Sequence, residues 1–170
     1  MITFETTRLI IREVSEEDFP YLLAIYTCRK NMEYISSGKF DWTMEELKSK
    51  YNRMNKDYRK GYGIFVAEKK DDHTIIGEAG LFDSFDDPAT LELGYIVDQN
   101  YWRKGFGHEI SEALIQYAFD RLGIEKVVAR MYADNLGSVS LSEKAGMKKT
   151  ETGTTPEGKV FYRYDLLKEE

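Results

Sequence analysis

NYWRKGFGH, residues 100–108, joins a strand-like segment to a well-patterned helix. Gly105 and Gly107 remove side chains where that helix begins, so backbone N–H groups stand exposed and another molecule can approach closely. A helix N-terminus carries unpaired donors and a partial positive charge, to which Arg103 and Lys104 add two full charges. This combination is typical of a diphosphate-binding site. An isolated pair of glycines is equally compatible with a tight turn that binds nothing.

Other phosphate-binding and catalytic motifs do not fit the chain. There is no G-x-x-x-x-G-K-[ST] loop, and a dinucleotide fingerprint needs a third glycine where Ile110 stands. His108 and Glu109 begin like a zinc-protease motif, but Glu112 takes the place of the second histidine. No G-x-S-x-G elbow supports a serine hydrolase. Because His73 is the only other histidine, we expect no metal site.

Composition favours one folded domain over residues 1–170. Hydrophobic residues make up 42% of the chain and aromatic residues 14%, enough for a buried core. The net charge of −6 argues against nonspecific binding to nucleic acid or anionic membrane. Cys28 is the only cysteine, which excludes an internal disulfide and fits a reducing cytoplasm. No signal-peptide core or membrane-length apolar run is present, so we expect a cytoplasmic protein.

Hydrophobic periodicity predicts the order β-α-α-β-β-β-α-β-α-β, a mixed sheet with helices on both faces. Capping boxes, Ser15 with Asp18 and Thr43 with Glu46, open the first two helices. Segment 31–42 is predicted as a loop. The predicted strands cover residues 9–11, 62–68, 74–81, 90–97, 126–133 and 159–166, and the helices cover 19–26, 44–60, 107–122 and 136–145.

The glycine pair and the preceding sequence LGYIVD at residues 93–98 resemble the central motif of the GNAT N-acetyltransferases. The branch resembled most is the RimJ/RimL type, whose members acetylate ribosomal-protein N-termini and other amines. The resemblance covers almost the whole chain, including TTRL at 6–9, IGE at 76–78 and segment 135–147. It implies an α/β (α+β) fold whose mixed, mostly antiparallel sheet has six to seven strands and about four flanking helices.

The resemblance also implies acetyl-CoA as co-substrate and no metal. The diphosphate would lie on the loop formed by Arg103, Lys104, Gly105, Phe106 and Gly107. Trp102 departs from the general pattern, which has Gln or Arg there, but large or aromatic residues are common at this position in the RimJ/RimL branch.

The strand that precedes this loop would hold the pantetheine arm. By resemblance, its backbone at Tyr95, Ile96 and Val97 would pair with the amides of CoA. A backbone N–H near Val97 would polarise the thioester carbonyl, a form of oxyanion stabilisation that supplies ~2.7–4 kcal/mol per donor.

Transfer to an amine requires the amine to be neutral. A lysine-type amine has a pKa of ~10.4 and an α-amine ~7.7–8.0, so a base is needed mainly for the former. Glu92 lies in an apolar strand, where partial burial would strengthen it as a base, and it aligns roughly with the catalytic glutamate of histone-type members. A strand-face glutamate paired with a lysine is the alternative, weighted equally. Glu78 is the second candidate, for which a solvent-facing or ion-paired role is favoured.

The departing thiolate needs a hydrogen-bond donor. Ser142 stands four residues before Gly146, where the general family has a tyrosine, and RimL-type enzymes are similar in having serine there. A small helix-surface residue is the alternative. Asn135 and Ser138, at the start of the same helix, are expected to contact CoA, and Asn135 also suits an N-cap.

The predicted function is an acetyl-CoA-dependent N-acetyltransferase that acts by direct attack of a primary amine on the thioester. The amine is a protein N-terminus, a polyamine or another small amine, and we expect a monomer or homodimer with no nucleic-acid or membrane partner. Cys28 is far from the motif in sequence, which argues against a covalent enzyme intermediate. A catalytically silent CoA-binding regulatory module is the alternative, kept open by Trp102 and Ser142.

The acceptor pocket is expected among the variable helices and loops. Tyr34 and Trp42 are candidates, with Asp83, Asp86 and Asp87 attracting a cationic amine. For the acidic loop, a plain solvated turn is the slightly preferred alternative.

Overall fold

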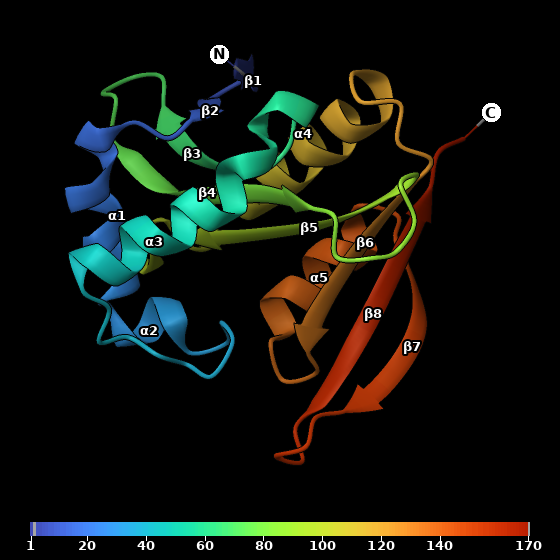
Figure 1. Ribbon diagram of the computed structural model, residues 1–170. Helices are drawn as coiled ribbons and strands as arrows, with labels where there is room; N and C mark the ends of the chain where they lie inside the picture. The colour runs from blue at the N-terminus through green and yellow to red at the C-terminus, as the bar shows by residue number, and fades with distance from the viewer. Residues whose placement is uncertain (2, 170) are drawn as a thin grey trace.

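The computed structural model describes Met1 and residues 3–169, apart from the side chain of Asp57. Within these residues it contains eight strands and five α-helices (Figure 1). The strands are β1 (Thr3–Glu5), β2 (Leu9–Glu13), β3 (Ile64–Lys69), β4 (Ile75–Phe82), β5 (Thr90–Val97), β6 (Lys126–Tyr132), β7 (Lys148–Thr154) and β8 (Val160–Leu167). The helices are α1 (Phe19–Tyr26), α2 (Arg29–Met32), α3 (Met44–Met54), α4 (Phe106–Asp120) and α5 (Leu136–Lys144), with short 3-10 turns at Glu16–Asp18, Asn55–Lys60 and Gln99–Tyr101.

All the described strands join one sheet in the order β1-β2-β3-β4-β5-β6-β8-β7. Neighbouring strands run antiparallel except β5 and β6, which run parallel. The mixed sheet confirms the predicted fold class, with β1 and β7 in addition to the six strands located from sequence. Strand β1 has three residues, and β7 is a polar, mostly exposed edge strand, so neither carries the hydrophobic alternation that identifies a strand.

Two hydrophobic cores cover the two faces of the sheet. Along β3, Phe65 and Ala67 belong to the core under α4, whereas Ile64 and Val66 belong to the core under α1 and α3. Alternate residues of a strand point to opposite faces, so β3 reads as a continuous apolar run because both faces are buried. Figure 1 shows α3 in front of the central strands and α4 behind them.

The capping boxes start helices as expected. The Thr43 hydroxyl accepts from Glu46 N at 3.2 Å, and Glu46 accepts from Thr43 N at 2.9 Å, which opens α3. The Ser15–Asp18 box opens a 3-10 turn that leads into α1. The short helix α2 follows α1 after two residues and ends at Met32, so the first two residues of the segment predicted as a loop are helical.

The sheet divides in two between β5 and β6. The ladder joining these strands covers only Thr90, Leu91 and Glu92 of β5. Beyond that point β5 stays paired with β4 as far as Val97, while β6 stays paired with β8 as far as Tyr132. Figure 1 shows the two halves diverging, with α5 beside β6. The outer edge of β5 over residues 93–97 therefore has no ladder partner on β6.

The pairing of β4 with β5 leaves no room for a side chain at Gly77. A Cβ at Gly77 would lie 2.0 Å from the carbonyl oxygen of Ile96. We predict that Gly77→Ala lowers the free energy of unfolding by about 3 kcal/mol, the upper part of the range for overpacking, because the two strands must separate.

Urea denaturation measures this effect, and Gly137→Ala in α5 is the matched control. The nearest atom to a Cβ at Gly137 is 3.8 Å away and its backbone is helical, so alanine there should stabilise by about 0.4–1 kcal/mol. Equal stabilities of the two variants would contradict the register of β4 on β5.

Candidate active site

The loop between β5 and α4 forms a concave array of amide groups. Arg103 and Gly105 both adopt the left-handed conformation, with φ of 57° and 83°. The first hydrogen bond of the α4 ladder runs from Glu109 N to Gly105 O at 3.1 Å, so the amides of Phe106, Gly107 and residue 108 precede it. Exposed amides at a helix N-terminus bind anions. The side chains of Arg103 and Lys104 are exposed beside them and supply positive charge.

Arg8, near the start of the chain, holds this loop in place, a role that the sequence analysis missed. Its guanidinium Nη1 donates to Lys104 O at 2.9 Å and its Cζ lies 4.0 Å from the centre of the Phe106 ring. Its Nε donates to Glu109 Oε2 at 2.7 Å. The sequence placed Arg8 only in the opening strand, and no local pattern connects residues that are 96 positions apart.

Glu109 completes the anchor from the first turn of α4. Its carboxylate also accepts the backbone N–H of Arg8 at 2.8 Å and the hydroxyl of Thr6. Burial opposes ionisation, but the hydrogen bonds from Thr6 and Arg8 outweigh it and lower the pKa of Glu109. The loop therefore rests on an ionised carboxylate.

Gly107 brings α4 close to α5. A Cβ at this position would lie 2.8 Å from Leu141 Cδ1 and 3.6 Å from the Tyr95 ring. Glycine is needed here because two helices and a strand meet, whereas at Gly105 it is needed for a left-handed backbone.

The backbone of β5 faces the gap between the two halves of the sheet. Asp98 N donates to Ile76 O at 2.8 Å, so Gly77 and Val97 form a non-hydrogen-bonded pair of the antiparallel ladder. The N–H and C=O of Val97 therefore point away from β4, and those of Tyr95 do the same two residues earlier.

Trp102 closes one end of this edge, another role that the sequence did not reveal. Its indole Nε1 donates to Val97 O at 2.6 Å. The aromatic residue that departs from the general family pattern thus satisfies the last carbonyl of the strand. The Val97 N–H remains directed into the gap.

The first turn of α5 borders the same gap. Asn135 caps the helix by accepting from Ser138 N at 3.3 Å, and its Nδ2 donates to Ser138 Oγ at 3.0 Å. Burial raises the pKa of Tyr95, and the nearby side chains of Ser138 and Ser111 oppose that rise. Ser142 is 7% exposed, so the alternative of a helix-surface residue is wrong.

The predicted base Glu92 lies in an ion pair. Both of its oxygens accept from Arg130 on β6, at 2.8 Å each. The Arg130 guanidinium also stacks 5.3 Å from the ring of Phe85, which Arg163 contacts at 4.8 Å. Glu92 is therefore a fixed carboxylate near the point where β5 and β6 separate, and its role as a base stays a prediction.

The second candidate, Glu78, is buried within hydroxyl groups. It is 7% exposed and accepts from the hydroxyl of Tyr26 at 2.8 Å and from that of Tyr51. In the β4–β5 register it stands opposite Ile96. Lys50 Nζ lies 3.8 Å from its Oε1. The structure thus excludes a solvent-facing position for Glu78 and agrees with the ion-paired alternative.

The acidic loop is a hydrogen-bonded turn. Asp87 forms the turn, accepting from Thr90 Oγ1 at 2.6 Å and from Ala89 N at 3.0 Å, which agrees with the preferred solvated-turn alternative. These hydrogen bonds, of which that from Thr90 has the largest effect, lower the pKa of Asp87.

Cys28, far from the motif in sequence, lies beside the end of β5, where its Sγ accepts from Gln99 Nε2 at 3.2 Å.

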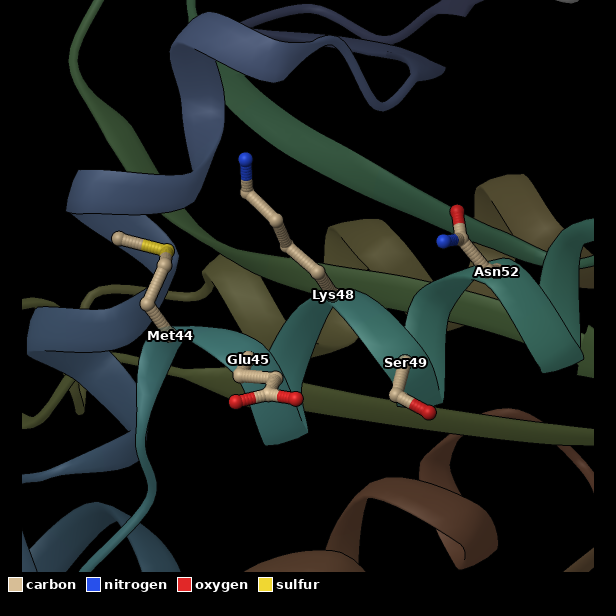
Figure 2. A pocket seen from close by; sticks show the side chains of 5 residues that line it. All are labelled: Met44, Glu45, Lys48, Ser49 and Asn52. Atoms are coloured by element: carbon tan, nitrogen blue, oxygen red, sulfur yellow. The ribbon is translucent and has the colours of Figure 1, made fainter.

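Other features of the described residues lie outside this region. An open depression on α3 is lined by Met44, Glu45, Lys48, Ser49 and Asn52, none of which is a predicted site residue (Figure 2). Among the side chains that the structure describes, no group of three or more His, Cys, Asp or Glu residues could hold a metal ion. No helix in the described ranges has both the length and the apolarity of a membrane span.

The chain matches the family model described as an acetyltransferase (GNAT) domain over residues 8–148. It is 28% identical over 171 residues to the uncharacterized N-acetyltransferase YnaD of Bacillus subtilis, covering 97% of this chain and 96% of that protein. A second Bacillus subtilis relative, the uncharacterized N-acetyltransferase YoaA, is 27% identical over 146 residues, with coverages of 85% and 82%. The chain therefore belongs to the GNAT acetyltransferase family and is an acyltransferase.

Solved structures show the same fold. A GNAT-family acetyltransferase from Bacillus anthracis has a TM-score of 0.85 at 23% identity, with 98% of both chains covered. Spermidine N-acetyltransferase from Vibrio cholerae, solved with CoA and spermine, has a TM-score of 0.82 at 20% identity and coverages of 95% and 96%. The ribosomal-protein α-N-acetyltransferase RimL, solved with coenzyme A, has a TM-score of 0.86 at 15% identity, with 98% of both chains covered.

The Arg8–Glu109 anchor makes stability depend on pH. The pKa of Glu109 lies below its ordinary value of 4.5, so its contribution is fully present above that value and is lost as the pH falls through the lowered pKa. We predict that the stability difference between wild type and Glu109→Gln, measured by urea denaturation, is largest near pH 6 and shrinks toward pH 3. A difference that does not change over this range would contradict the anchor.

Proposed function

We propose that this acetyltransferase moves the acetyl group of acetyl-CoA to a primary amine by direct attack on the thioester. The observation that carries the proposal is the continuity of two features. The loop at residues 103–108 follows β5 after one 3-10 turn, and Trp102, just before the loop, donates back to the last carbonyl of β5. One long ligand with a diphosphate at one end and amide groups in its arm matches both.

The residues present fit coenzyme A. The diphosphate would be held by the backbone of the loop and by two cationic side chains, the pantetheine arm by the β5 backbone, and the adjoining part of the ligand by the first turn of α5. In order, these residues are Arg103, Lys104, Gly105, Phe106 and Gly107, then Tyr95, Ile96 and Val97, and then Asn135 and Ser138. When bound, acetyl-CoA supplies an activated acyl group.

The chain's own groups would then act on the reacting atoms. The Val97 N–H points away from β4 into the gap, because Val97 and Gly77 form a non-hydrogen-bonded pair, and it would donate to the thioester oxygen. Glu92 would accept the proton of the attacking amine, directly or through water. Ser142, buried on α5, would donate a hydrogen bond to the departing sulfur.

The acceptor is a primary amine on a small molecule or a protein N-terminus. Two neighbours with the same fold are named for these two kinds of acceptor: one is a spermidine N-acetyltransferase and the other a ribosomal-protein α-N-acetyltransferase. A thiol-release assay against a panel of polyamines, small amines and peptides tests the proposal. Turnover of at least one amine well above the background hydrolysis of acetyl-CoA is expected. No turnover with retained CoA binding would favour the silent regulatory module.

Gly107→Val tests the loop. The added side chain collides with Leu141, so α5 must move away from α4, and we predict that the Kd for CoA measured by calorimetry rises at least tenfold. The double variant Gly107→Ala with Leu141→Ala is the matched control, because it removes the atom that a Cβ would strike. Recovery of affinity in the control is expected. Unchanged affinity in Gly107→Val would overturn the assignment of the loop.

Glu92→Gln tests the base. General acid–base catalysis contributes about 10²–10⁴-fold, so we predict a fall in kcat of at least about 100-fold for an alkylamine acceptor, with CoA affinity unchanged. The loss should be smaller for an α-amine acceptor, whose lower pKa leaves more of it neutral. Glu78→Gln, measured in parallel at saturating acceptor, assigns the base to the buried carboxylate instead if it alone lowers kcat.

A further inference from the structure

Lys50 of α3 places its ammonium group inside a box of aromatic rings. Its Nζ lies 4.5 Å from the centre of the Tyr26 ring and 5.8 Å from the centres of the Trp42 and Tyr51 rings. It also donates a hydrogen bond to the Tyr26 hydroxyl. Aromatic faces around a cation are the general means by which proteins recognise alkylammonium groups.

A buried carboxylate forms the base of the same box. The Tyr26 hydroxyl donates to both oxygens of Glu78 at 2.8 Å, and the Tyr51 hydroxyl donates to one of them. Burial, together with the charge of Glu78, raises the pKa of both tyrosines well above 10. The two hydroxyls therefore stay protonated and act as donors. The box combines one negative charge with three rings, which suits a monovalent organic cation.

Lys50 reaches Glu78 through the Tyr26 hydroxyl, to which it donates a hydrogen bond, rather than through a close ion pair. The distance of 3.8 Å between its Nζ and Glu78 Oε1 exceeds the ~2.7–2.9 Å of a charge-assisted hydrogen bond. Its side chain is 21% exposed, whereas that of Glu78 is 9% exposed, so the box opens to solvent along the lysine stem. Lys39, the other lysine near Trp42, already has carboxylate partners in Asp41 and Glu46. Of Lys39 and Lys50, only Lys50 occupies the box.

The box lies one strand away from the edge that the proposed function assigns to acetyl-CoA. Glu78 on β4 stands opposite Ile96 on β5, and both side chains face α1 and α3. Directly opposite residues in an antiparallel pair have Cβ atoms ~4.5–5.5 Å apart. A molecule with one amine in the box thus has its other end near the β5 edge.

We propose that Tyr26, Trp42, Tyr51 and Glu78 form a binding site for the protonated amine of an aliphatic diamine or polyamine, and that Lys50 occupies this site in the free protein. The amine that attacks a thioester must be neutral, whereas the box holds a cation. The acceptor therefore needs two amines, one to bind and one to react. Its role as an acceptor rests on the proposed function, but occupancy of the box does not.

Calorimetry with n-butylammonium and 1,4-diaminobutane, in the absence of CoA, tests the site. Lys50→Ala removes the internal competitor, so the Kd for both ligands should fall roughly tenfold or more relative to wild type. Adding Glu78→Gln to Lys50→Ala should abolish the gain. Lys48→Ala is the matched control, because Lys48 lines the depression on α3 and pairs with Glu16, and it should bind like wild type (Figure 2). Equal affinity of wild type and Lys50→Ala would overturn the proposal.

A second measurement uses the wild-type chain, in case Lys50→Ala does not fold. The ε-methylene protons of Lys50 should resonate away from the position of ordinary lysine, because the Nζ beside them lies 4.5–5.8 Å from the centres of three rings. Titration with 1,4-diaminobutane should return them to the ordinary position as Lys50 leaves the box. An unchanged Lys50 resonance at saturating diamine would refute the exchange.

The same samples, titrated with CoA, separate the two proposals. CoA binding without diamine binding would refute the box and leave the proposed transferase intact. Diamine binding without CoA binding would support the box and refute the transferase.

Discussion

The structure depends on the fact that the ladder between β5 and β6 stops after three residues of β5. Parallel strands usually pair along their length, yet only three residues of β5 pair with β6. Backbone N–H and C=O groups need partners, so an unpaired stretch in the middle of a sheet is costly unless something else satisfies it. Trp102 satisfies one carbonyl. The N–H and C=O of Tyr95 and the N–H of Val97 face the gap. A ligand with amide groups of its own can pair with them there.

The two carboxylates near this gap illustrate how environment separates residues of the same type. Glu92 is fixed by two hydrogen bonds from Arg130, near the point where β5 and β6 separate. Glu78 is buried under α1 and α3 and is held by tyrosine hydroxyls, with an ammonium group nearby. We propose proton transfer for the first and recognition of a cation for the second. Glu92 stands on β5, which carries the unpaired edge, and Glu78 stands on the neighbouring strand β4.

Local patterns predicted the features that local chemistry determines. The glycines at 105 and 107, the capping box at Thr43 and the apolar stripe of α4 each have a mechanism within a few residues. The sequence could not reveal Arg8 as the anchor of the loop, because the contact joins chain segments 96 residues apart. It also missed the short strand β1, the polar edge strand β7 and the contact of Cys28 with Gln99, since none of these carries a hydrophobic period.

The central claim is that the edge of β5 and the amides at the start of α4 bind one ligand, coenzyme A. Backbone amide NMR of the intact chain during a CoA titration tests it most directly. The account predicts saturable shifts of the amides of residues 103–108 together with those of Tyr95 and Val97. Saturation with shifts confined to other elements, or no shift at millimolar CoA, would contradict it.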